Sequence, residues 1–114
     1  MPFINSKVNF PLTEDNRETL KTELGKIITL FPGKSESHLM INLDDDCKMY
    51  FAGKNDFRMA IIEVKVFGAV NESASEKVTA AITQLYSKSF DISPDKIYVK
   101  YEPCNVWGMG GYNF

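Results

Sequence analysis

The chain has 114 residues, of which 44% are hydrophobic and 25% are charged, a composition typical of one globular domain with a small core. Its 13 basic and 15 acidic residues are interspersed and give a net charge of −2, so no basic face indicates binding to nucleic acid or to an anionic membrane. No apolar run approaches the ~20 residues of a membrane span, and no signal-peptide pattern is present. We therefore expect a cytoplasmic protein that binds neither nucleic acid nor membrane.

Residues 3–10 alternate between apolar and polar types and predict a strand, which Pro11 stops. Pro2 fits the first position of this strand, where the missing backbone N–H is tolerated. A chemical alternative is that removal of Met1 makes Pro2 a free secondary amine, able to act as a base or a nucleophile. This segment alone leaves both interpretations open.

A helix with one buried stripe is predicted from Thr13, a favoured N-cap residue, to the FPG at 31–33. The stripe consists of Leu20, Leu24, Ile27, Ile28 and Phe31. Strand character returns over 38–43, and the three aspartates at 44–46 predict a solvated turn. A short strand over 48–51 is expected to follow.

The second half repeats this order. A strand is predicted over 60–67, then a helix from about Ser73, a turn at 93–95 and a strand over 96–101. Asn71 is a candidate cap for this helix, and Ser73 with Glu76 forms a second candidate, a capping box. A shift of 58 positions keeps strand, cap, helix stripe and returning strand in register, as when Ile4 is paired with Ile62. One offset that holds through three elements indicates an internal repeat.

Two βαβ units, about 2–46 and 60–103, predict one α+β domain over residues 1–114. Its four-stranded sheet would carry both helices on one face and leave the other bare. The strand at 61–67 has few polar positions on either side, which predicts burial on both faces. We therefore expect the chain to associate with copies of itself.

Common catalytic and ligand motifs are absent or incomplete. The GKS at 33–35 lacks the first glycine of a phosphate-binding loop, and the GMGG at 108–111 is interpreted as a hinge. Cys47 and Cys104 are too far apart for a CxxC motif and fit reduced thiols. With His38 as the only histidine, one chain has no Ser/His/Asp triad and no multi-histidine metal site. We expect no metal and no cofactor.

Five features occur together in order: Pro2 after Met1, a GK pair before the second strand, an EVKVFG strand end, ISPDKIYVKY, and a glycine-containing tail that ends in NF. Over its whole length the chain thereby resembles the macrophage migration inhibitory factor family of the tautomerase superfamily, in particular microbial members. The resemblance implies a homotrimer of two βαβ units per subunit, with three sheets around a central channel.

The resemblance also implies site residues. Pro2 takes the place of the family's catalytic base, Lys34 that of its substrate-carboxylate lysine, and Tyr98 that of its tyrosine on the last strand. Phe67 departs from the common Ser-Ile-Gly pattern; its backbone amide can still bind a substrate oxygen, while its ring reshapes the pocket. Lys100 replaces an asparagine of the animal cytokine and adds a second cation. Further apolar pocket residues are Phe3, Trp107 and Phe114.

The implied activity is keto–enol tautomerisation of phenylpyruvate-like 2-keto acids. Burial of Pro2 near Lys34 and Lys100 would lower its pKa and free its lone pair at neutral pH. With Met1 attached, the nitrogen of Pro2 is an amide and has no basicity. The alternative is a non-catalytic trimeric binding protein or a secreted cytokine mimic, released without a signal peptide and bound by a host receptor, which rests on family analogy alone.

Overall fold

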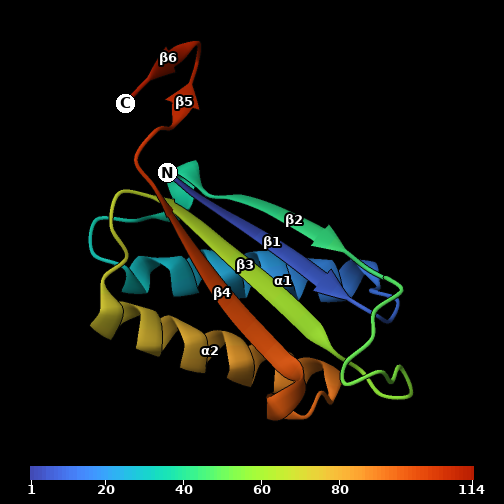
Figure 1. Ribbon diagram of the computed structural model, residues 1–114. Coiled ribbons are helices and arrows are strands. Elements are labelled where there is room, and N and C mark those ends of the chain that lie inside the picture. The colour runs from blue at the N-terminus through green and yellow to red at the C-terminus, as the bar shows by residue number, and fades with distance from the viewer.

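The computed structural model describes all residues, 1–114. Strands β1 (Pro2–Val8), β2 (Met40–Asp44), β3 (Ala60–Phe67) and β4 (Ile97–Cys104) form a four-stranded sheet of order β2-β1-β3-β4. Helices α1 (Glu14–Ile27) and α2 (Glu72–Phe90) lie together on one face of it (Figure 1). The predicted α+β fold, with two helices on one face of a four-stranded sheet, is confirmed.

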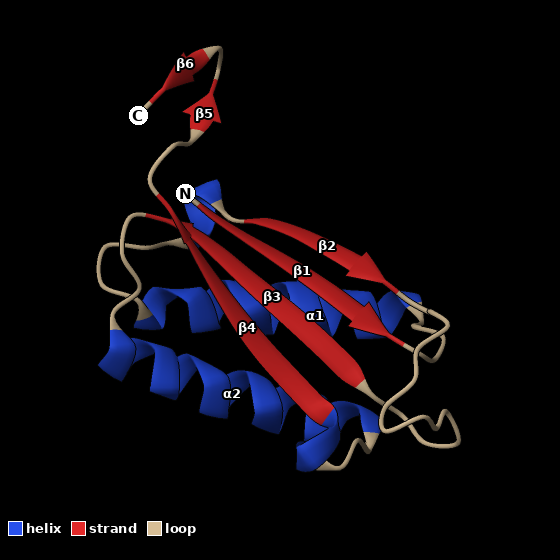
Figure 2. Ribbon diagram, viewed as in Figure 1, coloured by secondary structure: helices blue, strands red, loops and turns tan.

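The strands pair as two parallel couples joined at the centre. β1 pairs in parallel with β2 and β3 with β4, while β1 and β3 are antiparallel. Short 3-10 helices η1 (Ile28–Leu30), η2 (Glu36–His38) and η3 (Pro94–Lys96) follow α1 or precede the outer strands (Figure 2). No helix in the structure combines the length and the apolar character needed to cross a membrane.

Side-chain caps set the start of both helices. The Thr13 hydroxyl accepts from the Asn16 N–H at 3.0 Å, and the Asn16 carboxamide oxygen accepts from the Thr13 N–H at 2.9 Å, so the predicted cap of α1 is confirmed. At α2 the Asn71 side chain accepts from the Ala74 N–H at 2.8 Å. The predicted Ser73–Glu76 capping box is therefore wrong, because the helix already starts before Ser73.

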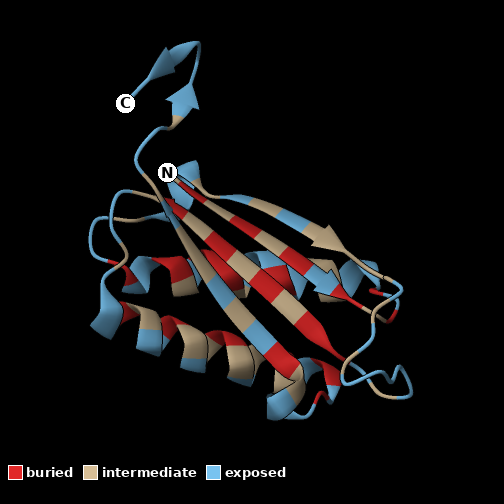
Figure 3. Cartoon of the chain, viewed as in Figure 1, coloured by how far each residue is buried: buried red, intermediate tan, exposed pale blue.

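The core lies between the sheet and the helices (Figure 3). Along β3 every second residue, including Ile62 and Val64, is buried against α1 and α2, whereas the residues between them are half-buried on the open face. Burial of β3 on both faces is therefore incomplete in a single chain. One polar pair enters the core: the Tyr86 hydroxyl donates to Ser6 Oγ at 2.7 Å.

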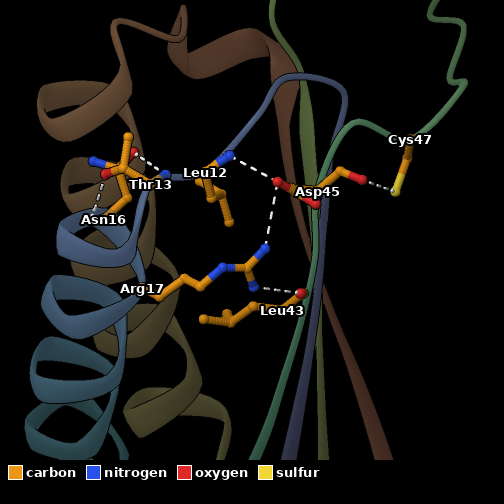
Figure 4. Close-up of polar contacts among 7 residues, drawn as sticks. All are labelled: Leu12, Thr13, Asn16, Arg17, Leu43, Asp45 and Cys47. Carbon is orange, nitrogen blue, oxygen red and sulfur yellow. Dashed lines mark hydrogen bonds and ion pairs between the residues drawn. The ribbon is translucent and has the colours of Figure 1, made fainter.

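Of the three aspartates predicted as a solvated turn, Asp44 ends β2 and Asp46 is exposed in a bend, whereas Asp45 ties α1 to the sheet (Figure 4). Its carboxylate accepts from the Leu12 N–H at 2.8 Å and lies 3.3 Å from the Arg17 guanidinium. Arg17 also donates to the carbonyl of Leu43, the next-to-last residue of β2, at 3.1 Å. These bonds join the start of α1 to the end of β2.

Two further sequence predictions are corrected. The strand expected over 48–51 is an irregular segment that ends in one isolated bridge between Phe51 and Lys54. The GMGG segment is part of a small hairpin instead of a hinge: its first two residues form β5 (Gly108–Met109), its last two form the turn, and β6 (Tyr112–Asn113) follows. Gly110 and Gly111 adopt φ of 63° and 92°, which a glycine turn permits. This hairpin projects from the sheet (Figure 1).

Candidate active site

The N-terminus, the end of β3 and the loop after η1 meet at one edge of the sheet. Pro2 is buried and in register with Val66. The Phe67 N–H donates to the Met1 carbonyl at 3.1 Å, and the Lys34 ammonium donates to the Phe67 carbonyl at 3.1 Å. The structure therefore brings together three of the predicted site residues, Pro2, Lys34 and Phe67.

A tight turn presents Lys34 to this edge. Its N–H donates to the Phe31 carbonyl at 3.1 Å, and Gly33 between them adopts φ of 77°, in the left-handed region that favours glycine. The GK pair is thus a turn glycine followed by the residue that reaches the end of β3. Its resemblance to a phosphate-binding loop has no structural counterpart.

The amine at the N-terminus is electrostatically perturbed. Burial is the main cause that lowers its pKa below the usual value, and the nearby Lys34 charge adds to the effect. This amine belongs to Met1, so the nitrogen of Pro2 is an amide in the structure.

Aromatic side chains surround this edge. The rings of Phe67 and Phe114 lie 6.0 Å apart, so the last residue of the chain lies close to the end of β3. The Phe114 N–H donates to the Trp107 carbonyl at 2.9 Å, which closes the C-terminal hairpin on itself. Phe3 alternates to the face of the sheet opposite Pro2 and lies 5.8 Å from the Lys65 ammonium. The chain thus places Phe3 on the open face, opposite the face toward which Pro2 lies, and Phe114 against Phe67 at the end of β3.

Tyr98 and Lys100 lie elsewhere on the sheet. Tyr98 is in register with Ile61, five positions along β3 from Val66, which corresponds to ~16 Å at the usual rise per residue. Lys100 is in register with Glu63, between these two rows. A single chain therefore leaves both residues apart from Pro2.

Lys100 already has a partner, which the sequence analysis missed. Its ammonium donates to the Glu102 carboxylate at 2.9 Å, and this hydrogen bond is the main cause that raises the pKa of Lys100. Glu102 also lies 3.5 Å from Lys65 on β3. The signal was present in the sequence, because residues two apart on a strand share a face.

No three His, Cys, Asp or Glu side chains form a metal-binding group.

Comparison with known proteins decides the family. The family model for macrophage migration inhibitory factor matches residues 1–113. The chain belongs to this family. Macrophage migration inhibitory factor from Mus musculus is 25% identical over 93 residues, which cover 82% of this chain and 80% of that protein. The resemblance predicted from the sequence is therefore confirmed.

Solved structures of family members share the fold. The crystal structure of Leishmania major MIF2 has a TM-score of 0.91 and 28% identity, covering 100% of this chain and 97% of that chain. The homologue from Prochlorococcus marinus has a TM-score of 0.80 and 26% identity, covering 98% of both chains. The family fold thus extends to microbial proteins and includes the edge at which Pro2 lies.

Proposed function

We propose that this family member is a keto–enol tautomerase that acts on phenylpyruvate-like 2-keto acids, with Pro2 as general base after removal of Met1. One observation carries the proposal: buried Pro2, the Lys34 ammonium and the Phe67 N–H meet at one place. The pKa of the neighbouring Met1 amine is lowered by burial and by the Lys34 charge. Pro2, the next residue and the first of β1, is buried. A free amine at Pro2 would experience the same two effects, which favour the neutral form that a base requires.

The reaction moves one proton between carbon and oxygen. The Pro2 nitrogen takes a proton from carbon 3 of the keto acid, and the C–H electron pair forms the carbon–carbon double bond of the enol. The carbonyl oxygen gains negative charge and takes up the proton that the base removed. Because the proline ring fixes the direction of the lone pair, little further organisation precedes proton transfer.

Two hydrogen-bond donors fit the oxygens of such a substrate. The Phe67 N–H donates to the Met1 carbonyl, and it becomes free when Met1 is removed. The Lys34 ammonium lies next to this donor, at the Phe67 carbonyl. We assign Lys34 to the substrate carboxylate and the developing enolate charge, and the Phe67 N–H to a substrate oxygen. The rings of Phe67 and Phe114 would contact an aromatic substituent.

The proposed role of Tyr98 requires a second copy of the chain, because Tyr98 lies far along the sheet from Pro2 in its own chain. We propose that the copies form a homotrimer in which one subunit brings Tyr98 to the Pro2 edge of the next. The open sheet face supports this assembly, as do exposed apolar side chains on the periphery: Met40, Tyr50, Val106, Met109 and Tyr112. Lys100 would have to exchange Glu102 for the substrate carboxylate.

A relative of the same fold supports the substrate class. Pt0534, which is inactivated by 2-oxo-3-pentynoate, has a TM-score of 0.81 and 13% identity, covering 97% of this chain and 95% of that chain. The inactivator of that protein is a 2-keto acid. At this identity the likeness concerns the fold, and the substrate class is part of our proposal for this chain.

The decisive experiment makes two measurements on one sample. Intact mass determines whether Met1 has been removed, and NMR monitors the rate of phenylpyruvate keto–enol exchange. We expect protein without Met1 to accelerate exchange and Pro2→Gly to lose about 10²- to 10⁴-fold of that rate. Pro11→Gly is the matched control, because this exposed proline lies outside the sheet. Loss of Met1 without acceleration would overturn the proposal and favour a non-catalytic trimeric binding protein or a cytokine mimic.

A further inference from the structure

A tyrosine of β4 is tied to α2 on the helix-covered side of the sheet. The Tyr101 hydroxyl donates to the Ser75 carbonyl at 2.9 Å, and it lies 2.7 Å from the Thr79 hydroxyl. Because a hydroxyl has only one proton to donate, the Thr79 hydroxyl is the donor of the second bond. Tyr101 is half-buried, and these two bonds fix its side chain near the start of α2.

The ring of Tyr101 extends this anchorage to the turn that presents Lys34. Its centre lies 6.1 Å from that of Phe31, and the two rings meet edge to face at 81°. Phe31 is 4% exposed and belongs to the core, and its carbonyl accepts the Lys34 N–H at 3.1 Å. Since an edge-to-face pair of rings has a preferred geometry, the turn that begins at Phe31 is held relative to α2.

The same strand also holds the atom that the Lys34 ammonium contacts. β4 continues from Tyr101 to Cys104, whose carbonyl accepts the Gly68 N–H at 2.8 Å. Gly68 directly follows Phe67, and the Phe67 carbonyl accepts from the Lys34 ammonium at 3.1 Å. Tyr101 is therefore linked to both partners of this bond, to the lysine through the turn and to the carbonyl through β4.

We infer that Tyr101 is a positioning residue, which holds the Lys34 ammonium at the end of β3 and thereby raises the affinity for the substrate carboxylate. Its effect passes through Phe31 and the turn. A lysine side chain loses conformational freedom when it binds a carboxylate, and a fixed turn at its base lowers that cost. The effect on affinity rests on the proposed role of Lys34 in substrate binding.

Hydrogen exchange tests the positioning without any catalysis. Tyr101→Phe keeps the ring and removes the bonds to Ser75 and Thr79. In the full-length protein, measured by solvent-exchange NMR, the Lys34 amide should exchange about fivefold faster in this variant, because a turn with a looser anchor opens more often. Unchanged exchange of this amide would overturn the inference.

Tyr86→Phe is the matched control. It also removes a hydroxyl bond between a helix and a strand, but the partner of Tyr86 is Ser6 on β1. Exchange of the Lys34 amide should therefore stay at the wild-type rate in this variant. An equal increase in the Tyr86 and Tyr101 variants would overturn the inference, because it would assign the faster exchange to a general loss of stability.

Steady-state kinetics on protein without Met1 test the consequence for the substrate. Tyr101→Phe should raise the KM for phenylpyruvate about threefold with little change in kcat, whereas Tyr86→Phe should leave both unchanged. In a Lys34→Gln background the addition of Tyr101→Phe should have no further effect on KM, because the group that it positions is gone. An equal rise of KM with and without Lys34 would overturn the inference.

The two measurements separate this inference from the proposed function. A chain without tautomerase activity would refute the proposed function, and hydrogen exchange at Lys34 would still show whether Tyr101 holds the turn. A tautomerase whose Lys34 amide exchanges at the same rate in the wild type and in Tyr101→Phe would retain the proposed function and overturn the positioning role.

Discussion

The two faces of the sheet differ in how they are held. On the helix-covered face, Ile62, Val64 and their neighbours are buried among apolar side chains. On the open face, polar side chains that are half-buried or exposed form a chain across three strands: Asn42 donates to Asn5 at 2.8 Å, and Asn5 donates to Glu63 at 3.1 Å. Apolar burial stabilises far more than exposed polar contacts do, so the first face carries the stability of the single chain and the second is available for assembly.

The largest expected effect separates two adjacent isoleucines of β3. Ile62→Ala should lower the free energy of unfolding by about 4 kcal/mol, because it leaves a cavity under α1 and α2. Ile61→Ala, on the open face, should cost about 1 kcal/mol in dilute protein. Urea unfolding of both variants measures the difference.

Protein concentration sharpens this comparison. If copies cover the open face, the cost of Ile61→Ala should rise with concentration while that of Ile62→Ala stays nearly constant. Equal costs at the lowest concentration would contradict our assignment of single-chain stability to the helix-covered face.

The parts of the fold that repeat with a local period were predictable. Alternation along β1 and β3 and the apolar stripe of α1 lie within one segment each, and burial followed them. Contacts between distant segments were not predictable. Asp45 was misread as solvated because its partner, the Leu12 N–H, is 33 positions away in sequence. The Ser73–Glu76 box matched a capping pattern, but the helix is capped by Asn71, two residues earlier.

The site was less predictable than the fold. Periodicity placed Pro2 at a strand start but left its role open, and only the family resemblance joined it to Lys34. Sequence alone could not show that the Phe67 N–H meets the Met1 carbonyl, since this depends on the register of β1 against β3. The family resemblance also assigned Lys100 to the substrate, and it did not reveal that Glu102 competes for the Lys100 ammonium.

The next effect concerns the polar pair on the otherwise apolar face. Burial raises the pKa of Tyr86 to about 12, against an ordinary value of 10. The protonated phenol therefore contributes about 3 kcal/mol to stability below pH 10, and this contribution is lost as the pH rises through 12. Urea unfolding between pH 9 and 12 should show this loss in the wild type and much less of it in Tyr86→Phe.

Tyr86→Phe also leaves Ser6 Oγ without its donor, so the double variant Ser6→Ala/Tyr86→Phe provides the control for that cost. Both variants should have the same flattened pH dependence. A single variant as sensitive to alkali as the wild type would assign the effect to other groups.

A smaller effect is expected at the end of β3, at Lys34. Lys34→Gln should raise the KM for phenylpyruvate about tenfold, because a charged donor to the carboxylate is lost. Without this positive charge the pKa of the N-terminal amine should rise, so the limb of kcat/KM that increases with pH should move to higher pH. Steady-state kinetics from pH 5 to 9 measure both, with Lys48→Gln as control. An unchanged KM and an unchanged profile would remove Lys34 from the site.

The smallest effect lies outside both faces, in the turn between Phe51 and Lys54. Ala52 and Gly53 adopt φ of 54° and 77°, the left-handed conformations of a two-residue turn that favours Asn-Gly. Ala52→Asn should therefore raise the free energy of unfolding by about 0.5 kcal/mol, whereas Gly53→Ala should lower it by about 1 kcal/mol. Thermal unfolding of the pair measures the sign. A gain of several kcal/mol from this loop would mean that single-chain stability is not concentrated on the helix-covered face.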